Sequence, residues 1–179
     1  RIPDDRKLSK MWQPREDEGH VQRVIAIEDV PLEQGTWLVL GRTHSKLESL
    51  KENLKERAIY YEYKNRKSYR QRLFRNILNY TRWTKGDKLS LTECKDLFEF
   101  LELEWVMTEE RLYNLKEFGF SFTDHWYEVF KSDPEESLYI RQMLSNGEKL
   151  NDAARVKLST IHAAKGGEAD NVLLILDNT

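Results

Sequence analysis

The stretch VKLSTIHAAKGGEADNVLLI, residues 156–175, decides the fold class of this chain. Residues 156–161 have the composition of a β-strand, and residues 171–177 form an almost wholly apolar run, as in a strand buried on both faces of a parallel sheet. Small residues and the pair Gly166-Gly167 between them indicate a turn whose backbone lets another backbone or a phosphate approach closely. The segment therefore predicts two strands of an α/β sheet joined by a glycine-bearing turn.

Three earlier stretches also have strand character: residues 21–27 (VQRVIAI), 37–40 (WLVL) and 58–63 (AIYYEY). A helix is expected between the last two, because Ser45 and Glu48 have the spacing of a capping box. Its inward stripe is expected at Leu47, Leu50 and Leu54. Strand, helix and strand in this order predict a compact βαβ unit with a parallel pair of strands.

Between residues 69 and 150 the periodicity becomes helical and the strand signal disappears. Ser90 and Glu93 form a second capping box, Thr108 begins another expected helix, and Asp133-Pro134 gives a third start signal. We therefore predict an α/β fold in which both ends of the chain, residues 1–67 and 153–179, build one parallel-sheet domain. Residues 68–152 form an all-α subdomain inserted into it, an arrangement tolerated where strand ends lie close together at a surface.

Composition places the chain among soluble, charge-rich proteins, with 39% hydrophobic and 34% charged residues among 179. No apolar run approaches the roughly 20 residues that cross a bilayer, so no membrane association is expected. A single cysteine, Cys94, is typical of a reducing, cytoplasmic setting, and the scattered histidines predict no metal site. Because the first residue is Arg1 and not methionine, we expect the chain to begin inside a longer protein.

The pattern T-x-H-x-x-K-G-x-E followed by an apolar strand resembles motif V of UvrD/Rep-type superfamily 1 DNA helicases. Its five specified positions are occupied here by Thr160, His162, Lys165, Gly166 and Glu168. The resemblance implies a second RecA-like domain in which Thr160, His162 and Lys165 lie along single-stranded DNA. It also implies that Glu168, with Gly166 permitting the turn, approaches the ribose of ATP. Gly167 departs from the large apolar residue usual in the family. A βα turn with a surface Lys-Glu pair is the alternative for such a segment taken alone.

Arg42 follows the apolar run at residues 37–40, so a buried strand delivers it to the same carboxyl-end edge as the motif. This stretch resembles the family's motif IV, in which an arginine reaches the γ-phosphate of ATP and acts as an arginine finger, worth about 10³-fold or more in rate. Gly41 stands where the family often has an aromatic. The resemblance implies that Arg42 and Glu168 share one cleft rim; the alternative is an arginine paired with a surface carboxylate.

Charge is unevenly distributed along the chain although its net value is −2. Residues 60–75 hold six basic side chains and one acid, interleaved with aromatics, whereas residues 92–118 hold eight acids and three bases. The ordinary interpretation of the basic stretch is a solvated helix face. In the family the helical subdomain inserted here can touch duplex DNA, so candidate DNA contacts are Arg66, Lys67, Arg70 and Arg72.

The sequence contains no G-x-x-x-x-G-K-[ST] phosphate loop and no helicase-type acidic pair for Mg²⁺. By resemblance, ATP with Mg²⁺ is held mainly by an N-terminal RecA-like domain outside this sequence, and the partner is single-stranded DNA or a single-/double-strand junction. We expect the intact protein to be an ATP-hydrolysing helicase and this chain alone to be inactive. The alternative is a non-catalytic nucleic-acid-binding module on a helicase-like frame; a stand-alone nucleotide-binding enzyme ranks last for want of a phosphate loop.

Overall fold

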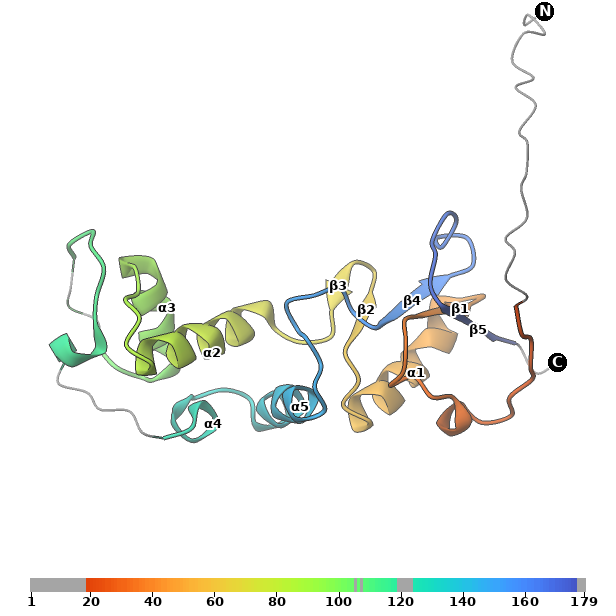
Figure 1. Ribbon diagram of the computed structural model, residues 1–179, viewed down its shortest axis with the longest axis horizontal. Helices are drawn as coiled ribbons and strands as arrows, with labels where there is room; N and C mark the ends of the chain where they lie inside the picture. The colour runs from red at the N-terminus through yellow and green to blue at the C-terminus, as the bar shows by residue number, and fades with distance from the viewer. Residues whose placement is uncertain (1–18, 105, 107, 119–123, 177–179) are drawn as a thin grey trace, which may run out of the picture. The chain divides into compact units, whose positions relative to one another are not determined.

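The computed structural model describes residues 19–104, 106, 108–118 and 124–176. Its sheet has five strands in the order β3-β2-β4-β1-β5 (Figure 1). The strands are β1 (Trp37–Gly41), β2 (Tyr61–Tyr63), β3 (Arg66–Lys67), β4 (Val156–Thr160) and β5 (Asn171–Ile175). All neighbours pair in parallel except β2 and β3, which form an antiparallel hairpin. The mixed α/β class and the mostly parallel sheet drawn from both parts of the chain are confirmed.

The helices are η1 (Ile27–Asp29), α1 (His44–Glu56), α2 (Gln71–Thr84), α3 (Leu91–Phe100), η2 (Leu115–Phe118), α4 (Trp126–Val129) and α5 (Pro134–Ser145). The chain divides into two units, residues 1–31 and residues 32–179. In the first unit the strand predicted at residues 21–27 is wrong, since the described residues before η1 have no regular structure. Val21 and Ile25 are 94% and 99% exposed, so their alternation has no sheet to pack on. The loop predicted at the chain start lies almost wholly in residues 1–18, outside the described residues.

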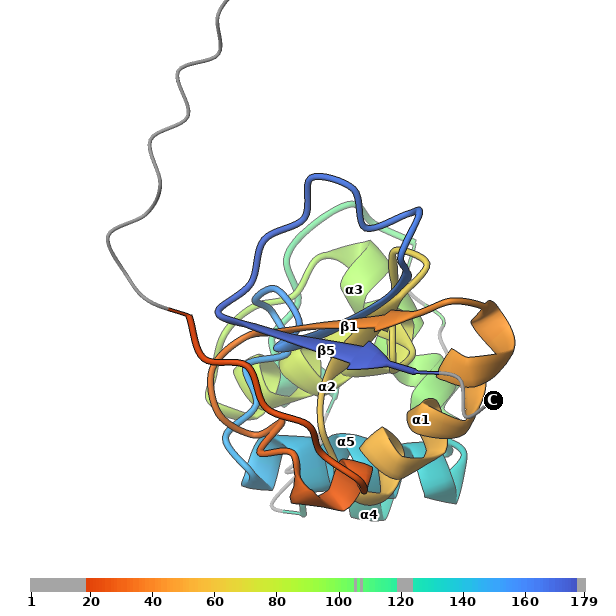
Figure 2. The same cartoon turned by 90° about the vertical axis from the view of Figure 1, so that its right-hand side faces the viewer.

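The strand β1 lies between β4 and β5, and Val39 at its centre is fully buried. Helix α1 covers one face of the sheet with the three leucines of its predicted stripe, all buried. A Cβ at Gly41 would lie 3.1 Å from the Leu47 side chain, so glycine at this position lets the helix approach the strand closely. The β4–β5 connection passes on the opposite side of the sheet from α1 (Figure 2).

Two expectations about this region are wrong. The strands β1 and β2 are not a pair, because β4 lies between them and pairs in parallel with both. The capping box at Ser45 does not form, because α1 begins at His44 with the extended residue Thr43 as its N-cap and no side-chain capping bond. Glu48 pairs instead with Lys51 one turn later.

The strand β5 was expected to be buried on both faces, and it lies at the edge of the sheet instead. Val172 and Leu174 are 59% and 49% exposed. A continuous apolar run predicts a central strand only when neighbours on both sides supply the burial, and here β1 alone flanks it.

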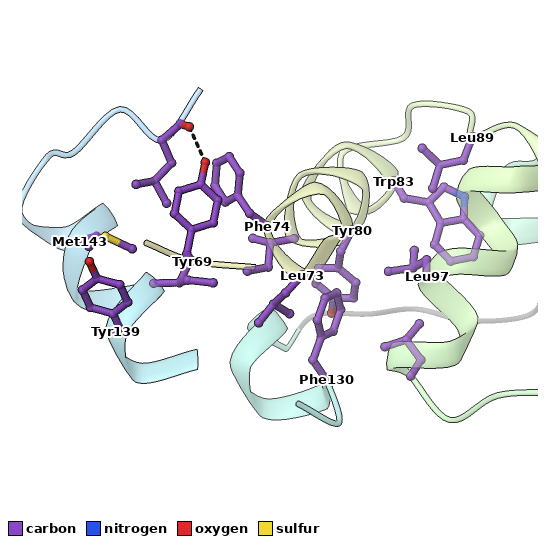
Figure 3. Close-up of a cluster of buried hydrophobic side chains, with 14 of the residues drawn as sticks. Tyr69, Leu73, Phe74, Tyr80, Trp83, Leu89, Leu97, Phe130, Tyr139 and Met143 are labelled. Carbon is purple, nitrogen blue, oxygen red and sulfur yellow. Dashed lines mark hydrogen bonds between the residues drawn. The ribbon is translucent and has the colours of Figure 1, made fainter. Parts of the chain in front are cut away.

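The helices α2 to α5 share one aromatic-rich core (Figure 3), in which Trp83 is fully buried and packs edge-on against Phe118 at 5.5 Å. The same cluster includes Ala58 and Tyr60 from the segment leading into β2, so its packing is continuous with the α/β part. The predicted box at Ser90 is confirmed, with reciprocal bonds to Glu93 of 3.3 and 2.8 Å.

Helix α5 begins where predicted, with the Asp133 carboxylate accepting from the amide of Glu135 at 2.9 Å. The helix predicted to start at Thr108 is wrong. Among described residues, Tyr113 forms an isolated bridge with Leu89, and the short helix η2 follows it.

Tyrosine hydroxyls join the chain segments that enter and leave the helical part. The Tyr139 hydroxyl of α5 lies 2.8 Å from the Ile59 carbonyl oxygen and 2.8 Å from Ser68 Oγ. The Tyr69 hydroxyl donates to the Leu150 carbonyl at 2.5 Å (Figure 3). Buried hydrogen bonds of this kind hold the chain segment that enters the helical part and the segment that leaves it in fixed positions relative to each other.

Replacing Tyr139 by phenylalanine is expected to lower the free energy of unfolding by about 1–2 kcal/mol, because the buried Ile59 carbonyl loses a donor. Tyr127→Phe is the matched control, since that tyrosine is only half-buried and its ring stacks on His125. Urea denaturation followed by circular dichroism measures both. Equal stabilities of the two variants would contradict the role assigned to Tyr139.

Helix α3 ends with Glu102 in the left-handed region, at φ 52°, while the amide of Leu103 bonds to the Phe98 carbonyl at 3.0 Å. Helix α2 ends in the same way but with Gly86 at φ 100°. Glu102→Gly should therefore raise the free energy of unfolding by about 1 kcal/mol, and Gly86→Ala should lower it by about 1 kcal/mol. Thermal melts of both variants test this sign reversal, and a destabilised Glu102→Gly variant would contradict it.

Candidate functional site

A pocket of about 420 Å³ lies at the carboxyl end of β4. One wall is the start of the β4–β5 connection, residues 163–167, and the other is the turn of the β2–β3 hairpin. His44, the first residue of α1, also lines it. The pocket therefore gathers the ends of two neighbouring parallel strands, which is where α/β sheets bind ligands. Its volume is near the lower end of the roughly 300–1,000 Å³ of small-molecule sites.

The motif residues do not all meet in this pocket. Thr160, Lys165 and Gly166 line it, whereas His162 and Glu168 are exposed and lie outside its described lining. Gly166 has φ +84°, so this turn needs the glycine that the sequence predicted. The Thr160 hydroxyl accepts from the amide of Ala163 at 3.3 Å, so it also closes the first turn of the connection.

The predicted shared rim for Arg42 and Glu168 is not evident from the backbone. Arg42 directly follows β1 at its carboxyl end. The connection has already turned back at Gly167, whose ideal Cβ lies 3.5 Å from Leu38 near the start of β1. Glu168 follows Gly167 in this connection and is exposed. The joint contact of Arg42 and Glu168 with ATP stays a prediction.

The end of the β4–β5 connection is hydrogen-bonded to Thr36, the residue that precedes β1. The Asp170 carboxylate accepts from the amide of Thr36 at 3.0 Å and from its hydroxyl at 2.6 Å. In return the Asp170 amide donates to the Thr36 hydroxyl at 3.1 Å. The hydrogen bonds from Thr36 hold the pKa of the Asp170 carboxyl below its ordinary value of 3.8.

Positive charge dominates the pocket. Among its described lining residues, Lys64, Lys157 and Lys165 are cationic and Glu62 is the one carboxylate. The strand register sets Glu62 opposite Lys157 on neighbouring strands. Such a surface favours an anionic ligand over an apolar one.

The hairpin wall was missed by the sequence interpretation, which placed DNA contacts further along the basic stretch. Tyr63 is central to it: its hydroxyl lies 2.8 Å from Nδ1 of His44, and its ring centroid is 5.1 Å from the ammonium groups of Lys51 and Lys64. Lys64 and Asn65 both have positive φ, at 51° and 59°, and form the two-residue turn. An asparagine between two strand-like runs is the sequence signal that predicts such a hairpin.

Most of the basic stretch has partners inside the protein. Arg72 bonds Asp96 at 3.0 Å and also pairs with Glu99, while Arg70 pairs with Glu136 at 3.0 Å. Lys67 donates to the Leu150 carbonyl at 3.0 Å in the tyrosine junction. The fourth candidate DNA contact, Arg66, is exposed on β3. The solvated-face interpretation therefore fits this stretch better than a DNA contact.

Within the described residues, no group of three or more histidine, cysteine, aspartate or glutamate side chains could hold a metal ion. No helix of the described part combines the length and apolar character that crossing a membrane requires. The lysines of the pocket are therefore the feature of the described residues that indicates a class of ligand.

The bonds between Asp170 and Thr36 predict a pH-dependent contribution to stability. Because the folded pKa of Asp170 lies below its unfolded value, the contribution is present above about pH 4 and is lost as pH falls through the folded pKa. Asp170→Ala should melt below wild type at pH 7, and the difference should shrink in melts near pH 2. Asp170→Asn, whose amide oxygen can accept the same bonds, is the control; a difference independent of pH would contradict this account.

A scan against protein-family models, a search of curated proteins and a search of solved structures each found no match. Any functional assignment therefore depends on the motif at residues 156–175 and on the geometry of the pocket. These two observations coincide at the carboxyl end of β4, where Thr160, Lys165 and Gly166 line the pocket.

Proposed function

We propose that this chain is the second RecA-like motor part of a UvrD/Rep-type superfamily 1 DNA helicase, and that it binds single-stranded DNA at the carboxyl end of β4. The observation that carries the proposal is a cationic pocket whose lining includes three motif residues, Thr160, Lys165 and Gly166. The spacing of the motif and the position of the pocket are independent of each other, and they indicate the same edge of the sheet.

The pocket's chemistry suits a nucleic-acid backbone. Lysine ammonium groups neutralise phosphates and release counterions, which supplies most of the affinity for single strands. The left-handed turn at Gly166 brings main-chain groups to the surface without a side chain in the way. His162, exposed just before this turn, is available to a base or sugar that leaves the pocket.

In this proposal the ATP, with its Mg²⁺, is held mainly by an N-terminal RecA-like domain, and Arg42 and Glu168 act on the nucleotide from this side. Closing on ATP and opening after hydrolysis would move the Thr160 edge along the strand. The coupling is a conformational equilibrium biased by nucleotide contacts. This chain supplies no phosphate loop, so by itself it binds DNA and does not turn over ATP.

The second candidate is a non-catalytic single-strand-binding module on the same frame. The cationic lining of the pocket supports it as well, because a module that only binds DNA needs no shared nucleotide rim. Both candidates require the same DNA contact. They differ in whether the intact protein hydrolyses ATP when DNA is present.

We expect the chain to bind a fluorescent oligothymidylate of about 16 nucleotides, a length typical of single-strand sites. Lys165→Gln should weaken binding about fivefold at 0.1 M salt, since one lost phosphate contact lowers the salt slope by about 0.7. Lys95→Gln, on the exposed face of α3 outside the pocket, is the matched control. Fluorescence anisotropy over a range of salt concentrations measures both quantities.

Absence of binding by the wild-type chain, or equal effects of Lys165→Gln and Lys95→Gln, would contradict the proposed site. DNA-stimulated ATP turnover by the chain alone would contradict the proposal that ATP is held mainly by an N-terminal domain.

A further inference from the structure

Two lysines to which the helicase resemblance gives no role line the pocket, one in the hairpin wall and one on β4. We propose that Lys64, in the β2–β3 turn, and Lys157, on β4, bind backbone phosphates of the single strand together with Lys165. This inference rests on the proposed function, because it names the contacts that the same ligand makes on the second wall. The strand would then pass between the hairpin and the β4–β5 connection.

The hairpin presents Lys64 in a fixed position. Tyr63 pairs with Arg66 across a two-residue turn, and both turn residues adopt the left-handed conformation required by the tightest hairpins. The Lys64 ammonium group lies 5.1 Å from the centre of the Tyr63 ring. A cation over an aromatic face is attracted by the ring's quadrupole, so Tyr63 supports the lysine.

Tyr63 also links this turn to the other elements around the pocket. Its hydroxyl lies 2.8 Å from Nδ1 of His44 at the start of α1, and the two rings meet edge to face at 5.7 Å. The bond uses Nδ1, so Nε2 is the ring nitrogen of His44 left to meet a ligand. Tyr63 is therefore a positioning residue that holds one lysine and one imidazole at the same wall.

Lys157 reaches the pocket from its floor. It lies in β4, between β2 and β1, and is exposed although both of its neighbours along the strand, Val156 and Leu158, are buried. Its partner in the β2 register is Glu62, so one carboxylate opposes three ammonium groups in the described lining. The excess of positive charge is what a chain of phosphates requires.

The presence of Glu62 makes the inference testable by a gain of affinity, which damage to the fold would not produce. Glu62→Gln removes the opposing charge and should tighten oligothymidylate binding about threefold, from a unit charge acting at close range through water. Lys64→Gln and Lys157→Gln should each weaken binding about fivefold at 0.1 M salt and lower the salt slope by about 0.7. Lys95→Gln should change neither quantity.

Two substitutions of Tyr63 separate positioning from general damage. Tyr63→Phe keeps the ring under Lys64 and should retain the wild-type salt slope, whereas Tyr63→Leu removes the ring and should lower the slope as Lys64→Gln does. Melting temperatures of all variants are measured alongside, so that a loss of slope in a folded protein is attributed to the lost contact.

The outcomes are distinguishable from those that test the proposed function. If the wild-type chain binds and Lys165→Gln weakens it, but Lys64→Gln and Lys157→Gln match Lys95→Gln, the second wall is refuted and the motif edge stands. If the wild-type chain does not bind the oligothymidylate, the proposed DNA site and the contacts of Lys64 and Lys157 are both refuted. Competition by duplex DNA as strong as that by the single strand would show a general polyanion surface and would overturn the assignment to single strands.

Discussion

The parallel ladder between β4 and its two neighbours is the interaction on which the rest of the structure depends. Leu158 pairs in register with Val39 of β1 on one side and with Tyr63 of β2 on the other. A strand from late in the chain thus separates two strands from early in the chain, so after β3 the chain leaves the sheet and returns to it at β4. The helical part is a consequence of that route, and the pocket lies where the returning strand ends.

Some basic side chains pair with carboxylates inside the protein, and others line the pocket. Arginines at the start of α2 meet carboxylates of α3, as in the pair of Arg75 with Asp96 at 2.7 Å, so the basic and acidic stretches of the sequence largely satisfy each other. Exposed pairs of this kind contribute little individually, but they offset the positive charge of those arginines at the surface. Lys64 in the β2–β3 turn and Lys157 on the central strand β4 line the pocket outside this network of arginine–carboxylate pairs, which is why the pocket is cationic in a chain of net charge −2.

Local patterns predicted those elements whose signals are themselves local. The runs that became β1 and β4, the box at Ser90 and the start of α5 at Asp133 are all set within a few residues. The failures concern burial and pairing supplied from far along the chain. The alternating residues 21–27 have no partner strand among the described residues, and the apolar β5 lies at an edge. The pocket shows the same contrast. The spacing of the motif predicted the wall that contains Thr160 and Lys165, whereas the hairpin wall depends on the pairing of β2 with β4, which is not visible in the sequence.

The course of the β4–β5 connection follows from the parallel pairing of the strands that it joins. Because β4, β1 and β5 are parallel, the chain leaving β4 has to return the length of β1 before β5 begins, and it does so over the face opposite α1 (Figure 2). The five residues of β1 span about 16 Å at about 3.3 Å per residue. The connection therefore covers a comparable distance along this face before β5 begins. Val172 and Leu174 of β5 stay exposed because no further strand pairs with β5 in the described sheet, so this edge keeps an apolar surface in contact with water.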